Sequence, residues 1–271
     1  MKLGLIGFPV EHSLSPVMQE AALKAAGLEG TYLALNTPPA FLRARLQEVR
    51  RDYAGVNVTI PHKESVLAYL DELSPEARAI GAANTIVCDQ HRLIGYNTDA
   101  MGFISGLDEA GISYRNKKAL VLGAGGAARA IAYALQEEGA HVAVYNRTLE
   151  RAQALCDALG LHLVRESLLE AAVRSCDLLV NTTSVGLQDP HSSPLPAGML
   201  PRAGAVVDIV YNPPVTRLMQ EAQNAGLPTL GGLPMLVWQG ALAFELWTGV
   251  KADVRVMYEA AQARLNETVR L

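Results

Sequence analysis

Short apolar runs alternate with helix-like segments along nearly the whole chain. Each run has the length of a strand that is buried on both faces. This alternation is typical of α/β proteins whose sheets consist mainly of parallel strands. The predicted strands lie at residues 2–7, 31–36, 55–59, 84–88, 118–122, 141–145, 177–181 and 205–209.

The helical segments are bounded by residues that commonly start and stop helices. Residues 16–26 predict a helix with Ser15 as its N-cap and Gly27 as its stop. Further helices are expected at residues 126–138, at about 235–248 and at about 253–265.

A domain boundary is predicted near residue 100. A second series of strands and helices begins there, with a glycine-rich loop at its first turn. The 271 residues are enough for two modest domains, each with its own core. We expect one domain from residues 1–100 together with 236–271, and a second from residues 101–235.

Composition narrows the chemistry to small molecules. The formal net charge is −4, so no strong basic field would attract nucleic acid. No apolar segment reaches the roughly 20 residues that span a bilayer, and the short N-terminal run does not fit a signal peptide. Three scattered cysteines suit the reducing cytoplasm, and no Cys/His cluster suggests a metal site.

Residues 117–129, KKALVLGAGGAAR, place a glycine-rich turn between a predicted strand and a predicted helix. Gly123, Gly125 and Ala128 fit the pattern G-x-G-x-x-[G/A] of nucleotide-binding loops. Gly123 would permit the tight turn, and Gly125 would let the backbone approach a pyrophosphate at the helix N-terminus. The alternative is a plain tight turn, which the second strand that follows disfavours.

The end of that second strand indicates the cofactor. NAD-binding proteins usually carry an acidic residue there, which hydrogen-bonds the ribose hydroxyls. Here the sequence is Asn146-Arg147-Thr148, with Arg151 one turn on. A guanidinium pairs with a 2′-phosphate, whereas a carboxylate would repel it, so this strand end favours NADP. The alternative is that both arginines are solvated residues at a helix start.

A lysine and an aspartate follow predicted strands in the first domain. Lys63 ends the segment NVTIPHK, in which Pro61 stops the strand, and Asp99 ends the segment GYNTD. Open α/β sheets bind ligands at the carboxyl ends of their strands, so the pair is placed to move a proton at a substrate oxygen. The residues alone leave open a surface lysine, and a Thr98 or Asp99 that caps a helix.

Other polar residues lie close to strand ends or inside an apolar helix. Ser13 and Ser15 follow the first strand, where hydroxyl groups beside a helix N-terminus can hold a carboxylate. Gln239 lies within an apolar helix, so its amide needs either substrate hydroxyls or backbone as a partner. Asn84 begins a predicted strand, and Tyr211 follows one.

Taken together, these stretches resemble the shikimate dehydrogenase family over nearly the whole chain. The matching segments, in order, are GFPVEHSLSP, GVNVTIPHK, GAANTI, GYNTDAMGF, LGAGGAARA, NRT, NTTSVGL, DIVYNPPVT and GGLPMLVWQGALAFELWTG. The resemblance implies NADPH-dependent, reversible reduction of 3-dehydroshikimate to shikimate in aromatic amino-acid biosynthesis. It also implies an N-terminal α/β substrate-binding domain, a Rossmann-type NADP-binding domain and an active-site cleft between them.

The resemblance implies roles for the matched residues. Lys63 and Asp99 would be the catalytic pair, and our hypothesis is that Lys63 transfers the proton while Asp99 orients it. Substrate would be bound by Ser13, Ser15, Thr59, Asn84, Tyr211 and Gln239. NADP would be bound by Gly123, Ala124, Gly125, Gly126, Ala127, Asn146, Arg147, Thr148, Arg151, Ile209 and Gly232.

Two other functions fit parts of the sequence. A quinate/shikimate dehydrogenase of the same superfamily would act on an acid with one more hydroxyl group. A non-catalytic NADP-binding regulator would keep Arg147 but would not need Lys63 and Asp99, and both are present. The family resemblance leaves a monomer and a homodimer open, and of the two a homodimer is the expected assembly.

Overall fold

The computed structural model describes residues 1–269, which form two compact units. Unit 1 comprises Met1–Gly102 and the chain from Leu236 onward, and unit 2 comprises Phe103–Met235. Residues 270–271, which the sequence places in the first domain, lie outside the described residues. No helix among residues 1–269 combines the length and apolar character that a membrane span requires.

Unit 1 is built on a six-stranded sheet in the order β2-β1-β3-β5-β6-β4. The first three strands along the chain are parallel, whereas β5 runs antiparallel to both β3 and β6, so the sheet is mixed. Its strands are β1 (Lys2–Gly7), β2 (Thr31–Asn36), β3 (Gly55–Val58), β4 (Glu72–Leu73), β5 (Thr85–Asp89) and β6 (Arg92–Tyr96).

The β5–β6 hairpin was not expected from the sequence. Its two turn residues, Gln90 and His91, both have positive φ angles, of 47° and 64°. Tight hairpin turns of this kind usually carry Asn-Gly or Asp-Gly, and neither pair occurs here. The antiparallel β5–β6 pair therefore has no local sequence signal.

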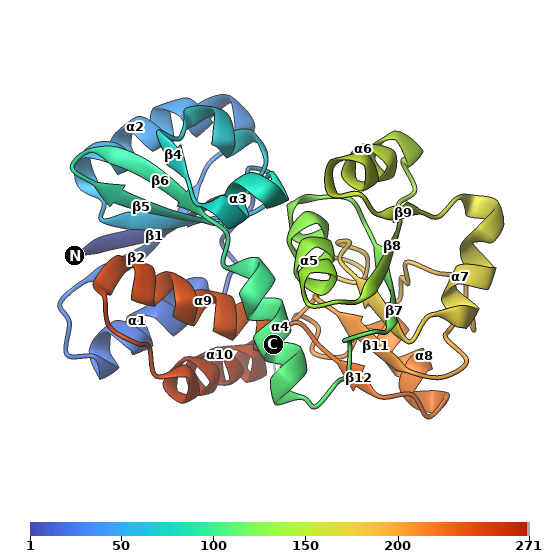
Figure 1. The fold of residues 1–271 in the computed structure, drawn as a ribbon. Coiled ribbons are helices and arrows are strands. Elements are labelled where there is room, and N and C mark those ends of the chain that lie inside the picture. The colour runs from blue at the N-terminus through green and yellow to red at the C-terminus, as the bar shows by residue number, and fades with distance from the viewer. Residues whose placement is uncertain (270–271) are drawn as a thin grey trace. The chain divides into compact units, whose positions relative to one another are not determined.

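Helices cover both faces of the unit 1 sheet, with α2 on one face and α1, α9 and α10 on the other (Figure 1). The helices that lie wholly or partly in this unit are α1 (Ser15–Ala25), α2 (Leu42–Asp52), α3 (Pro75–Ile80), α4 (Asp99–Glu109), α9 (Leu233–Thr248) and α10 (Val254–Val269). Both α4 and α9 cross the boundary between the units. Trp247 links α9 to β5 of the sheet, because its Nε1 donates a hydrogen bond to the Ile86 carbonyl at 2.9 Å.

The start of α1 differs from the prediction. Leu14 occupies the N-cap position and Ser15 is the first helical residue, so Ser15 is not the cap. The Ser13 hydroxyl instead accepts a hydrogen bond from the Ser15 backbone N–H at 3.2 Å. The predicted stop is correct, since Gly27 has a left-handed φ of 65° just after the helix.

Unit 2 is a six-stranded parallel sheet in the order β12-β11-β10-β7-β8-β9. Ligands of such doubly wound sheets bind at the carboxyl ends of the strands. Its strands are β7 (Lys118–Leu122), β8 (His141–Tyr145), β9 (His162–Leu163), β10 (Leu178–Asn181), β11 (Ala205–Asp208) and β12 (Thr229–Leu230). Its helices are α5 (Gly126–Glu137), α6 (Leu149–Leu159), α7 (Leu169–Ser175) and α8 (Arg217–Asn224).

Candidate functional site

Lys63 and Asp99 form an ion pair in unit 1, with Nζ 2.6 Å from Oδ2. Their side chains are only 14% and 5% exposed. A buried pair commonly costs as much in lost hydration as it gains in Coulomb attraction, so it is weak evidence for stability. A chemical role explains better than a gain in stability why Lys63 and Asp99 are kept as a buried ion pair.

The Asp99 carboxylate can pair with Lys63 because the side chain of another residue, Asn97, caps α4. The side-chain Oδ1 of Asn97 accepts hydrogen bonds from the backbone N–H groups of Asp99 and Ala100, at 3.1 and 3.4 Å. Thr98 directly precedes the first helical residue, and its carbonyl accepts a hydrogen bond from the Gly102 N–H at 2.9 Å. The side chain that caps the helix is nevertheless that of Asn97, not that of Thr98 or Asp99. The Asp99 carboxylate lies in the first turn of α4, where the helix dipole favours a negative charge.

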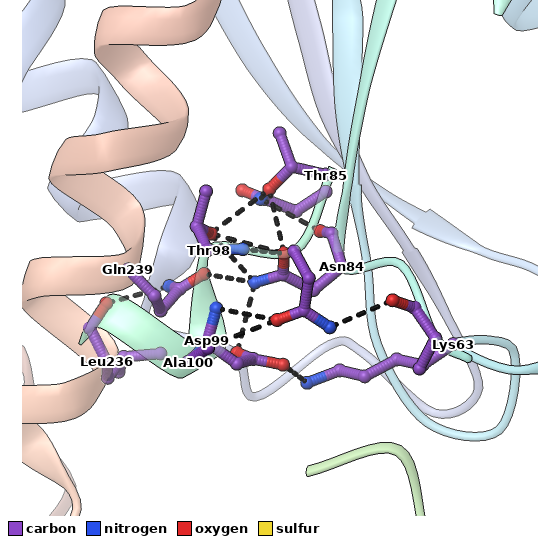
Figure 2. Close-up of polar contacts among 11 residues, drawn as sticks. Lys63, Asn84, Thr85, Thr98, Asp99, Ala100, Leu236 and Gln239 are labelled. Atoms are coloured by element: carbon purple, nitrogen blue, oxygen red, sulfur yellow. Dashed lines mark hydrogen bonds and ion pairs between the residues drawn. The ribbon is translucent and has the colours of Figure 1, made fainter. Parts of the chain in front are cut away.

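Asn84 joins the ion pair to the rest of the site, as Figure 2 shows. Its Nδ2 lies 3.0 Å from Oδ1 of Asp99, 2.9 Å from Oγ1 of Thr98 and 3.1 Å from Oε1 of Gln239. Since an amide carries only two N–H bonds, these three acceptors share them. Its Oδ1 accepts a hydrogen bond from the Thr98 backbone N–H at 2.7 Å, which fixes the orientation of the amide.

Gln239 reaches this network because α4 and α9 pack closely. A Cβ atom built on Gly102 would lie 2.7 Å from both the backbone N and the Cβ of Gln239, so a larger residue would push the helices apart. The Gln239 amide donates to the Leu236 carbonyl at 2.7 Å, and its oxygen accepts from Asn84. The Gln239 amide group thus forms hydrogen bonds with both a side chain and a backbone carbonyl.

A second layer of polar residues lies behind Asn84. These residues were not predicted as site residues from the sequence. Asn57 donates to the Asn84 carbonyl at 3.1 Å and to the Thr85 hydroxyl at 3.0 Å. Tyr32 in turn donates to Oδ1 of Asn57 at 2.7 Å. Burial raises the pKa of Tyr32, so its hydroxyl stays protonated and remains a donor. Only the alternation of Asn57 with apolar neighbours in β3 hints at a buried polar residue.

His62, beside Lys63, holds the turn that carries the lysine. It is 1% exposed, and its Nε2 lies 2.7 Å from the Thr37 carbonyl. Because a carbonyl only accepts, Nε2 is the protonated nitrogen. The turn is also fixed by the Ala83 N–H, which donates to the Lys63 carbonyl at 2.8 Å.

The other predicted substrate residues are divided between the units. Ser13, Ser15 and Thr59 lie in unit 1, beyond the ends of β1 and β3, and Ser15 is buried. Tyr211 belongs to unit 2, in the segment after β11. Ser13 and Ser15 are joined by the hydrogen bond at the start of α1.

In unit 2, the glycine-rich loop has the geometry that the sequence predicts. Gly123 has a φ of 120°, and a Cβ there would lie 2.4 Å from the Thr182 hydroxyl. Gly125 is the N-cap of α5 with an extended backbone, and an added Cβ would meet no atom within 4 Å. The first turn of α5 has no acidic residue and no side-chain cap among residues 1–269, so its N–H groups suit an anion.

A hollow of about 330 Å³ lies at the carboxyl ends of β8 and β9 in unit 2. Asn146 and Arg147 line it, as expected for the adenosine end of a dinucleotide. The Asn146 amide donates to the Thr148 carbonyl at 2.9 Å, which shapes the turn into α6. Arg165 and Glu166 also line the hollow, and sequence reasoning did not select them.

Ile209 and Gly232 are in direct contact. A Cβ on Gly232 would lie 1.9 Å from the Ile209 carbonyl oxygen, so only glycine fits at position 232. The segment after β11 is fixed by Asp208, whose carboxylate accepts hydrogen bonds from the Thr216 hydroxyl at 2.7 Å and the Asn181 amide at 3.0 Å. Burial raises the pKa of Asp208, and these hydrogen bonds offset that effect in part.

Among the described residues, no cluster of three or more His, Cys, Asp or Glu side chains could hold a metal ion. The ion pair lies in unit 1, and the anion-binding features lie in unit 2.

Family models match successive parts of the chain. Residues 5–86 match the shikimate dehydrogenase substrate binding domain, and residues 107–229 match the shikimate / quinate 5-dehydrogenase model. Residues 232–262 match the shikimate 5′-dehydrogenase C-terminal domain. The three matches follow the order in which the motifs occur along the sequence.

Individual relatives cover nearly the whole chain. A shikimate dehydrogenase (NADP(+)) of Thermus thermophilus is 54% identical over 98% of this chain and 99% of its own. The crystal structure of a shikimate 5-dehydrogenase from Thermus thermophilus with NADP(H) and shikimate is 53% identical, covers 98% of this chain and 100% of its own, and has a TM-score of 0.93.

A more distant solved relative has another named substrate. The quinate dehydrogenase of Corynebacterium glutamicum in complex with NAD is 32% identical over 97% of this chain and 99% of its own, with a TM-score of 0.89. The fold alone does not separate the two acids, but the identity to the Thermus enzymes is far higher. The chain belongs to the shikimate dehydrogenase family.

Proposed function

We propose that this protein catalyses the reversible, NADP-linked reduction of 3-dehydroshikimate to shikimate. The observation that carries the proposal is the buried Lys63–Asp99 ion pair, bound through Asn84 to Gln239. It occurs in a chain that is 54% identical to a shikimate dehydrogenase (NADP(+)).

The residues of unit 1 would carry out the proton transfer. NADPH, when bound, supplies the hydride that reduces the carbonyl carbon. The Lys63 ammonium would donate a proton to the carbonyl oxygen as negative charge develops on it. Asp99 would keep Nζ in position through the 2.6 Å contact. In the oxidative direction Lys63 would have to start as the neutral amine, whose Nζ lone pair would accept the proton from the substrate hydroxyl.

The remaining unit 1 residues would bind and orient the substrate. Ser13 and Ser15, at the start of α1, would hold the carboxylate together with Tyr211. Thr59, Asn84 and Gln239 would hydrogen-bond the ring hydroxyls. Support for this assignment comes from Asn84 and Gln239, whose amides already share one hydrogen bond with each other.

Unit 2 would bind NADP. The residues from Gly123 to Ala127 would hold the pyrophosphate at the N-terminus of α5, where Gly125 leaves open space. Asn146, Arg147, Thr148 and Arg151 would hold the 2′-phosphate end. Ile209 and Gly232, which are in contact, would lie at the nicotinamide end. The proposal assigns substrate binding to unit 1 and NADP binding to unit 2.

The test is a shikimate oxidation assay with NADP⁺ and NAD⁺ side by side, followed by the absorbance of the reduced nicotinamide. We expect turnover of shikimate with a clear preference for NADP⁺. Turnover of quinate with kcat/KM equal to or above that of shikimate would replace this proposal by the quinate/shikimate enzyme. Binding of NADPH without turnover of either acid would favour a non-catalytic regulator.

A cytoplasmic location and a homodimer stay predictions from the sequence. Sedimentation of the purified full-length chain would test the second of them.

A further inference from the structure

We propose that Arg165 is a further arginine, besides Arg147 and Arg151, that recognises the 2′-phosphate of NADP. This inference rests on the proposed function, because it concerns the same cofactor. It adds a residue that lies outside the turn Asn146-Arg147-Thr148 and outside α6, in the segment that follows β9.

The topology of unit 2 brings these two arginines to one hollow. Strands β8 and β9 are adjacent and parallel, with Val144 paired to Leu163. The pairing continues one residue further, since the Val164 N–H donates to the Val144 carbonyl at 2.9 Å. Their carboxyl ends therefore lie side by side, and the segments that follow them form the walls of the 330 Å³ hollow.

The hollow has the size and charge for a phosphorylated ribose. Its volume falls at the lower end of the usual range for small-molecule sites, roughly 300–1,000 Å³. Arg147 and Arg165 both line it, and within residues 1–269 neither guanidinium lies in salt-bridge contact with a carboxylate. A phosphate monoester carries a charge of about −1.5 to −2 at neutral pH, which two guanidinium groups would balance.

One acidic residue, Glu166, also lines the hollow and needs an explanation. Its carboxylate accepts a hydrogen bond from the Tyr145 hydroxyl. Burial and this hydrogen bond raise the pKa of Tyr145 to about 12, so the tyrosine remains a donor at neutral pH. Glu166 thus has a partner of its own, and it reduces but does not cancel the positive charge of the hollow.

An alternative position for Arg165 is against the adenine ring, since guanidinium groups stack on aromatic planes. Adenine is common to NAD and NADP, whereas the 2′-phosphate is present in NADP alone. The two contacts are therefore separated by comparing the two cofactors.

The experiment is calorimetric titration of the full-length protein and its Arg165→Ala variant with NADP⁺, NAD⁺ and adenosine 2′-phosphate. We expect Arg165→Ala to weaken NADP⁺ and adenosine 2′-phosphate by about 10-fold, as for the loss of one charge-assisted hydrogen bond, and NAD⁺ by less than about 2-fold. Arg165→Lys keeps the charge and should recover part of the loss. The loss should shrink as salt increases, because the hollow is open to solvent.

Arg202→Ala is the matched control, since Arg202 is an exposed arginine of unit 2 that does not line the hollow. It removes the same charge and should leave all three affinities unchanged. Equal weakening of NADP⁺ and NAD⁺ by Arg165→Ala would overturn the inference in favour of adenine stacking, and no weakening would overturn it outright. If the unaltered protein itself failed to bind NADP⁺, the proposed function would fail, which is a different result.

Discussion

The two candidate sites differ in what holds their residues. In unit 1, the side chains of Lys63, Asn84, Asp99 and Gln239 are bonded to each other, and they come from distant parts of the chain. In unit 2, the loop from Gly123 to Ala127 belongs to one continuous strand–turn–helix segment, and its key property is the absence of large side chains. The unit 1 site is a network of buried polar side chains, and the loop of the unit 2 site offers mainly backbone atoms.

Because of this difference, the two sites should respond differently to substitution. A network of buried polar groups couples function to folding, because removing one member leaves its partners unsatisfied. In the glycine loop, Gly125 faces open space, so it can change without cost to the fold. Substitutions in the unit 1 network should therefore affect stability and turnover together, and a substitution at Gly125 should affect cofactor affinity alone.

The largest effect is expected for Lys63→Ala. Loss of the proton donor should lower kcat by roughly 10²- to 10⁴-fold, with a much smaller change in KM for shikimate. It also leaves Asp99 buried without its ion-pair partner, so the free energy of unfolding should fall by about 3–5 kcal/mol. Steady-state kinetics and thermal unfolding measure the two effects.

Lys24→Ala is the control for that variant, because Lys24 is an exposed lysine of unit 1 on α1. It should leave kcat unchanged. If Lys63→Ala raised KM alone, Lys63 would be a binding residue and Asp99 would become the candidate for proton transfer.

A pair of glycine substitutions tests the comparison directly. Gly125→Ala should weaken NADP⁺ binding by at least about 10-fold with unchanged unfolding, because its Cβ meets no protein atom but would occupy the pyrophosphate position. Gly102→Ala should instead lower the free energy of unfolding by about 1–3 kcal/mol, because its Cβ would lie 2.7 Å from the Gln239 backbone.

Gly102→Ala should also raise KM for shikimate and leave NADP⁺ affinity unaltered. The comparison between the sites would be wrong if Gly125→Ala destabilised the fold as much as Gly102→Ala did. Calorimetric titration and chemical unfolding of the two variants decide this.

The smallest effect is a pH dependence in unit 2, at the buried network around Asp208. Burial raises the pKa of Asp208 above its unfolded value, so the folded state holds its proton more tightly. Its contribution to stability is thus largest below about pH 4 and is lost as the pH rises through the raised pKa. The slope is at most about 1.4 kcal/mol per pH unit.

Asp208→Asn has no such titration, while its amide oxygen can still accept hydrogen bonds from Asn181 and Val210. Unfolding free energies of the two proteins, measured from pH 4 upward, should therefore converge or cross as the pH rises. Parallel curves would show that the pKa of Asp208 is the same in the folded and unfolded states.

Much of the fold could be predicted because its signals are local. All eight predicted strands occur, with ends that differ by at most one residue, and the glycine loop lies between β7 and α5. The strands that the sequence missed are two-residue strands, which are too short for a pattern, and β6. That strand follows a turn formed by Gln90 and His91 without any glycine.

The candidate sites were only partly predictable. Arg147 could be chosen from its place after β8, because the preceding strand and loop fix its context. Lys63 and Asp99 had ordinary structural alternatives, and only the family resemblance favoured them. Arg165 was missed because β9 has two residues and carries no strand signal of its own.

Eight of the strands, the turn at Gly123 and the arginine at the end of β8 followed from the amino-acid sequence alone. These depend on backbone preferences and on spacing over a few residues. Three other features emerged only from the folded chain: Asn84 meets Gln239 across 155 positions, the side chain of Asn97 rather than that of Asp99 caps α4, and Arg165 lines the hollow beside Arg147. Strand pairing and helix packing bring such distant residues together, and no local pattern records which side chains will then share a hydrogen bond.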